Sequence, residues 1–241
     1  MKRQKVSLIL NIINVALVLF AALASTFDFN FMQLDNVLVE NDSLFQFYTF
    51  DSNLLMGIVS LIYVTYLILL INKKIEKMPK VVEILKLVST TAVGVTFFTV
   101  VLILAPFTNV PFYLFFTNSN LIFHLIVPVI SMVSLIVFED MHLKFVESLY
   151  SLSTVIVYGI YYTINVFVHM VDGKVDIKYD WYGFAQNGMV GIIISIIAIL
   201  SLTFGISTLL YFVNKKINEV RIKWFTNYYF YLLLEVHLVI S

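Results

Sequence analysis

Six segments of this chain are each long and apolar enough to cross a lipid bilayer, which takes about 20 mostly apolar residues. The apolar runs are continuous, whereas the strands of a membrane β-barrel alternate in polarity at every second residue. We therefore predict an all-α integral membrane bundle of six transmembrane helices that forms a single domain over residues 1–241. The spans are expected at about residues 6–26, 53–72, 87–107, 121–138, 148–168 and 189–213.

Composition excludes the main alternatives to a membrane protein. The chain is 61% hydrophobic and only 12% charged, whereas a soluble domain is roughly a quarter charged. A soluble enzyme, a nucleic-acid-binding protein and a disordered segment are therefore excluded. Cysteine is absent, and no three histidines or carboxylates have metal-ligand spacing on one helix, so neither a metal nor a cofactor is predicted.

The basic residues predict the orientation of the bundle. Thirteen of the 15 lysines and arginines fall on one side of the six-span arrangement, and only Lys174 and Lys178 fall on the other. Since cytoplasmic loops of membrane proteins carry an excess of basic residues, both termini are expected in the cytoplasm. Lys86 is assigned to the loop before the third span, so no lysine is expected inside a span, which argues against a retinal Schiff base.

The last segment of the chain is a further apolar stretch. Residues 224–241 are apolar and aromatic but short for a span. An interfacial helix on the cytoplasmic leaflet is the preferred interpretation, and a seventh span with an external C-terminus is the alternative.

The abundance of Ile, Lys, Asn, Phe and Tyr is typical of AT-rich bacterial genomes and favours a bacterial plasma membrane.

Polar residues inside apolar spans are costly and mark candidate sites. In the fifth span, polar residues recur every three or four positions and end on the outer side; they are Thr154, Tyr158, Tyr161 or Tyr162, Asn165 and His169. This stripe is either a hydrogen-bonded seam between helices or the lining of a site.

The fourth span places His124 about one turn inside the outer boundary. Asn120 precedes it by four residues and shares its helix face, and Pro128 follows by four residues and should kink the helix. A histidine beside a kink suits a cavity. The alternative is a buried histidine that is hydrogen-bonded to a neighbouring helix.

The second span opens with a third group of polar residues at the same outer end. Thr49 and Asn53 share one helix face, and Asp51 points elsewhere. The side chains of Asp51 and Ser52 are also suited to capping the helix N-terminus, and Thr49 could be hydrogen-bonded within the bundle. Residues from three helices thus collect at the outer end, which is the best candidate site in the chain.

Two segments of the sequence resemble a known family. Phe47-Tyr48-Thr49-Phe50-Asp51-Ser52-Asn53-Leu54-Leu55 opens the second span, and Leu121-Ile122-Phe123-His124-Leu125-Ile126-Val127-Pro128 opens the fourth. With the helix number and spacing, they resemble the androgen-induced family of small multi-span membrane proteins and its bacterial relatives, over about residues 6–213. The family often carries a Tyr-Pro-Phe motif before its last helix, where this chain has Asp180-Trp181-Tyr182-Gly183-Phe184.

The resemblance implies a threonine hydrolase that cleaves fatty acid esters of hydroxy fatty acids. By the match of the two motifs, Thr49 would be the nucleophile and His124 its base. Asn120 or His169 could orient the imidazole ring, and Asn53 or free backbone N–H groups at the start of the second span could stabilise an oxyanion.

The expected function is an intramembrane lipid-ester hydrolase or acyl transferase that acts on a fatty-acyl ester of the membrane. Asp51, Tyr161 and Asn165 are further candidates for binding or orienting the substrate. A transporter or channel whose path is lined by the stripe, or a structural membrane protein without chemistry, are the alternatives. The sequence leaves the substrate and the oligomeric state open.

Overall fold

The predicted six-span helical bundle is confirmed. The computed structural model describes residues 2–34, 44–107 and 110–240, with side chains as far as Arg221. The described residues form helices and loops but no strand, and six helical segments are long and apolar enough to cross a membrane. These segments are Lys2–Thr26, Tyr48–Ile71, Lys80–Leu104, Asn118–Phe138, Phe145–Val168 and Gly188–Arg221.

The first three spans are nearly regular helices. They are α1 (Lys2–Thr26), α2 (Tyr48–Ile71) and α3 (Lys80–Thr99), and α3 continues through the π-helical segment η2 (Val100–Leu104) into α4 (Ala105–Phe107). The third span therefore begins at Lys80, seven positions before the predicted start at residue 87. The expectation that Lys86 lies in a loop and that no lysine lies inside a span is wrong.

The fourth span is helical throughout but contains two π-helical segments. It consists of α5 (Asn118–Leu121), the π-helical η4 (Ile122–Ile126), α6 (Val127–Val133) and the π-helical η5 (Ser134–Phe138). Pro128 has no backbone N–H and cannot donate to the carbonyl of His124. The wider π-helical turn of η4, which contains His124, ends at Ile126, just before this proline. Such turns occur where the regular hydrogen-bond ladder of a helix is interrupted.

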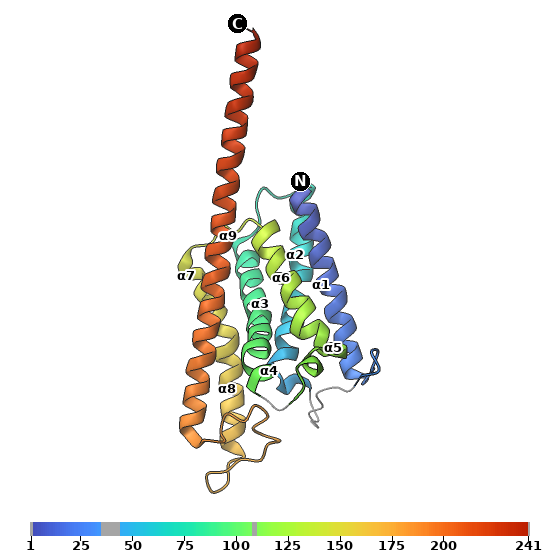
Figure 1. Cartoon of the computed structure of the whole chain (residues 1–241), viewed down its shortest axis with the longest axis vertical. Helices are drawn as coiled ribbons and strands as arrows, with labels where there is room; N and C mark the ends of the chain where they lie inside the picture. The colour runs from blue at the N-terminus through green and yellow to red at the C-terminus, as the bar shows by residue number, and fades with distance from the viewer. Residues whose placement is uncertain (1, 35–43, 108–109, 241) are drawn as a thin grey trace.

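The last two spans pack side by side along α3. The fifth comprises α7 (Phe145–Ser148), the 3₁₀ segment η6 (Leu149–Ser151) and α8 (Leu152–Val168), and the sixth is α9 (Gly188–Ile240). Helix α9 runs without a break into residues 224–240 and projects past the end of the bundle where α1 begins (Figure 1). The preferred separate interfacial helix is therefore not what the backbone forms, and the side chains of this stretch lie outside the described residues.

The two ends of the bundle differ in chemistry. One end, the basic end, carries the start of α1, the α2–α3 connection and the η5–α7 connection. The opposite end carries the loops that follow α1 and α8 and two short 3₁₀ segments, η1 (Leu44–Gln46) and η3 (Phe112–Phe116). In Figure 1 the basic end is at the top. The assignment of this end to the cytoplasm stays a prediction.

Candidate functional site

His124 is buried, with 8% of its surface exposed, and one ring nitrogen has a fixed partner. Its Nδ1 lies 2.7 Å from the carbonyl oxygen of Phe115, in η3. A carbonyl oxygen can only accept a hydrogen bond, so Nδ1 carries the proton. In the neutral ring Nε2 is then the unprotonated nitrogen. The ring is thus oriented by a backbone carbonyl, and within the described residues neither Asn120 nor His169 bonds to it.

Asn53 connects the two segments that carry Thr49 and His124. Its side chain is fully buried, and its Nδ2 donates to the carbonyl oxygens of Thr49, at 2.8 Å, and of Phe123, at 3.2 Å. The first turn of α2 is thereby held against η4, next to both candidate residues. Thr49 is half-buried, and in the described part of the chain no hydrogen bond joins its side chain to His124.

The N–H groups expected to donate to an oxyanion differ in whether they already donate a hydrogen bond within the protein. Both N–H groups of Asn53 are used by the carbonyls of Thr49 and Phe123, so Asn53 can offer none without breaking a bond. The Tyr48 N–H donates to the hydroxyl of Tyr182 at 3.0 Å. Among the described residues the backbone N–H of Thr49 has no such acceptor, because it lies in the first turn of α2.

Asp51 and Ser52 do not cap α2. The helix begins at Tyr48 with Phe47 at the N-cap position, so both residues lie inside the first turns. Ser52 instead donates to the carbonyl of Thr49 at 3.1 Å and shares a hydrogen bond of 3.0 Å with the hydroxyl of Thr96 in α3. Asp51 is half-buried, and its carboxylate has no hydrogen-bond partner in the described ranges.

The polar stripe of α8 forms a hydrogen-bonded seam. The Thr154 hydroxyl lies 2.9 Å from that of Tyr48, and the Tyr158 hydroxyl donates to the carbonyl of Gln46. Of the two adjacent tyrosines, Tyr162 faces inward and donates to Asp180, whereas Tyr161 is 48% exposed. These bonds join α8 to η1, α2 and the loop that follows α8.

The end of this seam farther from the basic end holds the α8–α9 loop. Asn165 Nδ2 donates to the carbonyl of Tyr179 at 2.8 Å, and the His169 ring stacks on that of Tyr179 with centroids 3.6 Å apart. The contacts of Asn165 and His169 therefore hold the loop and do not reach Thr49 or His124.

Burial raises the pKa of Tyr182 to about 12, so its hydroxyl stays neutral where it accepts from Tyr48.

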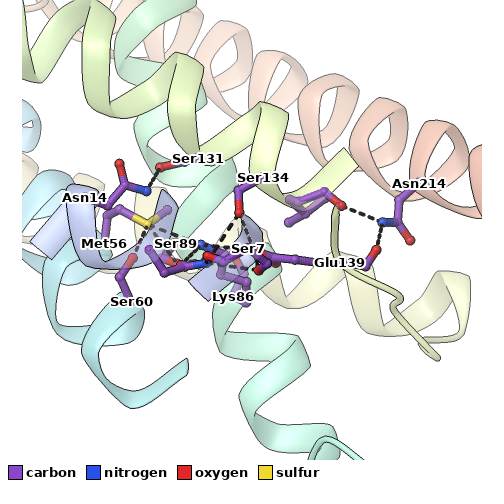
Figure 2. A network of polar contacts seen from close by, with 12 residues as sticks. Ser7, Asn14, Met56, Ser60, Lys86, Ser89, Ser131, Ser134, Glu139 and Asn214 are labelled. Carbon is purple, nitrogen blue, oxygen red and sulfur yellow. Dashed lines mark hydrogen bonds and ion pairs between the residues drawn. The ribbon is translucent and has the colours of Figure 1, made fainter. Parts of the chain in front are cut away.

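Sequence reasoning missed a second polar centre, which lies nearer the basic end of the bundle and is drawn in Figure 2. Lys86 is fully buried, and its Nζ lies 2.6 Å from Asn11 Oδ1 and 3.7 Å from Glu139 Oε1. The same carboxylate oxygen accepts from Ser7 at 3.2 Å, Asn11 at 3.1 Å and Ser134 at 2.7 Å. The signal was available, because Ser7, Asn11 and Asn14 share one face of α1 and Lys86 is flanked by apolar residues.

The loop after η5 is held to the bundle around this centre. Asn214 in α9 donates to the carbonyl oxygens of Leu135, at 2.6 Å, and of Glu139, at 2.8 Å. The neighbouring Asp140 accepts from Arg3 at 2.9 Å and from Arg221 at 3.0 Å. The first and last spans are therefore both bound to the segment that carries Glu139.

An apolar layer separates the two polar regions. Val18, Val93 and Val127, from α1, α3 and α6, are almost fully buried in one cluster that also includes Met56. In each helix the polar residues of the Lys86 centre lie on one side of this layer, and Asn53, Thr96 and His124 lie on the other. The layer is tight at Gly57, where an added Cβ would lie 2.8 Å from a methyl group of Val18.

Comparison with known proteins adds no relative. No family model matches the chain, and neither a curated protein nor a solved structure shows significant similarity to it. Arguments about function therefore rest on the chain's own geometry.

Proposed function

We propose that this protein is an intramembrane lipid-ester hydrolase or acyl transferase, with Thr49 as nucleophile and His124 as base. The observation that carries the proposal is the hydrogen bond of 2.7 Å between His124 Nδ1 and the Phe115 carbonyl. It fixes the ring and leaves Nε2 as the proton acceptor, which is the arrangement that a general base needs. The androgen-induced family remains a resemblance of the two motifs.

In the proposed reaction, the Thr49 hydroxyl attacks the ester carbonyl while His124 Nε2 takes its proton. The imidazolium then returns that proton to the departing alcohol, which leaves an acyl-threonine. Water, deprotonated by the same nitrogen, releases the acid, and an alcohol in its place gives acyl transfer. The backbone N–H of Thr49, in the first turn of α2, is the candidate donor to the oxyanion.

The position of Thr49 supports this assignment. Asn53 bonds to the carbonyls of Thr49 and Phe123 and so holds the helix start beside the segment of His124. Hydrogen bonds between nucleophile and base are often long before substrate binds and shorten in the complex. The exposed apolar side chains of the spans face the lipid phase, from which a fatty-acyl ester would enter.

A transporter is the second candidate, and the buried Lys86–Glu139 pair favours it. Ionisable residues within membrane spans often mark the path of an ion or solute. The apolar layer around Val18, Val93 and Val127 lies across such a path. Transport would therefore require the helices to separate at this layer, whereas hydrolysis at the Thr49 end would not.

The test is ester hydrolysis by the purified full chain in lipid nanodiscs with long-chain acyl esters. Thr49→Ala and His124→Asn should each lower the rate by about 10²-fold or more. The asparagine amide can still donate to the Phe115 carbonyl, so His124→Asn removes the base while keeping that bond. Thr154→Ala, a threonine of the seam, is the control and should retain the rate.

Three outcomes distinguish the candidates. Loss of hydrolysis in the two site variants alone supports the proposal. Equal hydrolysis in all four proteins contradicts the assignment of Thr49 and His124. Absence of hydrolysis, together with solute flux in liposomes that persists in Thr49→Ala, supports the transporter.

A further inference from the structure

We infer that the centre formed by Asn11, Ser134 and Glu139 is a binding site for a small monovalent cation, and that the ammonium of Lys86 occupies it. The inference does not rest on ester hydrolysis, because the apolar layer separates this centre from Thr49 and His124. It concerns the basic half of the bundle, for which sequence analysis predicted no site.

Two oxygen atoms from different segments lie beside the ammonium of Lys86. Asn11 presents Oδ1 to Lys86 Nζ at 2.6 Å, while its Nδ2 donates to Glu139 Oε1 at 3.1 Å. Glu139 Oε1 also accepts from Ser7 and from Ser134, so three donors hold the carboxyl group in place. An amide oxygen and a carboxylate oxygen thus lie beside the ammonium, and both are oxygen ligands of the kind that hard cations prefer.

One oxygen of the Glu139 carboxylate is unused in the described part of the chain. Glu139 is 2% exposed, and its Oε2 is buried without a hydrogen-bond partner among the described residues. A buried acceptor without a partner is costly and calls for an explanation. A cation that sat closer to the carboxylate than the ammonium does would give this oxygen a partner.

Lys86 fills the site loosely. One contact of its ammonium is short, at 2.6 Å, but the carboxylate lies 3.7 Å away, and the nearest further contacts are Met56 Sδ at 4.0 Å and the Tyr63 ring centroid at 5.5 Å. An ammonium has three N–H donors, and within the described residues only one of them has a strong acceptor. The Lys86 ammonium is thus a tethered cation, one attached covalently to the chain. The oxygens of the site could bind a smaller, free cation more closely.

The experiment removes the tethered cation and supplies a free one. Lys86→Ala vacates the ammonium position, and Lys86→Met is the matched control because its side chain still fills the space. Thermal unfolding of the full chain in detergent micelles is followed in methylammonium, Na⁺ or K⁺ chloride, with choline chloride at equal ionic strength as the reference. A cation that binds only the folded state raises Tm with saturation.

The expected result is a saturable rise of several degrees in the Tm of Lys86→Ala with methylammonium or Na⁺. Lys86→Met and the double variant Lys86→Ala/Glu139→Gln should show none, because the first lacks space and the second lacks the charge. No response of Lys86→Ala to any of the three cations overturns the inference, and so does an equal response of the double variant.

A second measurement covers failure of Lys86→Ala to accumulate. The variant is then produced and extracted in methylammonium or in choline, and the monodisperse fraction is compared by size-exclusion chromatography. Recovery in methylammonium alone supports the cation site. Equal loss in both contradicts it.

Discussion

The ammonium of Lys86 lies 3.7 Å from the carboxylate of Glu139, and both side chains are almost wholly enclosed by the bundle. Removing one partner of a buried pair leaves the other charge uncompensated, which costs about 3–5 kcal/mol. We therefore expect Lys86→Met and Glu139→Gln each to lower the free energy of unfolding by about this amount, measured by denaturation in mixed micelles.

The double variant Lys86→Met/Glu139→Gln should be more stable than either single variant, because it contains no unpaired charge. Additive losses in the double variant would show that the two groups do not act as a pair.

Gly57 allows the close approach of α1 and α2. A Cβ added at Gly57 would lie 2.8 Å from a methyl group of Val18. Overpacking of this kind typically lowers the free energy of unfolding by about 1–3 kcal/mol. We expect Gly57→Ala to lower Tm. Gly159→Ala is the matched control, because nothing lies within 4 Å of the added methyl group, and it should leave Tm unchanged or slightly higher.

Tyr162 and Tyr161 are adjacent but should respond differently to loss of the hydroxyl. The Tyr162 hydroxyl donates to Asp180, which is 2% exposed, whereas Tyr161 has no hydrogen-bond partner in the described structure. Tyr162→Phe should lower the free energy of unfolding by about 1–3 kcal/mol and speed proteolysis of the α8–α9 loop. Tyr161→Phe should do neither, and equal effects would contradict the seam.

The hydrogen bond from His124 to Phe115 fixes a tautomer that can be observed directly. In protein with ¹⁵N-labelled histidine, we expect Nδ1 of His124 to be protonated and Nε2 to be unprotonated. The His124→Asn variant identifies the signals. A protonated Nε2 in the neutral ring would remove the base from the proposed mechanism.

The number and type of the spans were predictable because lipid imposes a length of apolar sequence on every helix. The boundary of the third span was not, because the prediction placed every lysine in a loop. Lys86 can lie inside the bundle because the amide of Asn11 and the carboxylate of Glu139 compensate its charge. The hydroxyl of Ser134 in η5 donates to the same carboxylate. Sequence spacing along α3 carries no information about those neighbours.

The candidate site was predictable to a similar extent. Thr49, Asn53 and His124 belong to adjoining segments, since Asn53 bonds to the carbonyls of Thr49 and Phe123, and their roles stay a prediction. The partner of His124 was not predictable, because it is a backbone carbonyl of a 3₁₀ segment and any residue type could supply it. Tyr161 and Tyr162 differ by about 100° around the helix, and only the packing of the loop against α8 shows which one faces inward.

The apolar layer at Val18, Val93 and Val127 also limits the movement of charge inside the bundle. Aliphatic side chains offer no hydrogen bonds, so an ion that entered this layer alone would lose its solvation without compensation. A unit charge that crosses the full membrane potential gains or loses about 2.3 kcal/mol per 100 mV. Lys86 and Glu139 both lie on one side of the layer, so a rearrangement confined to their centre moves no charge through it.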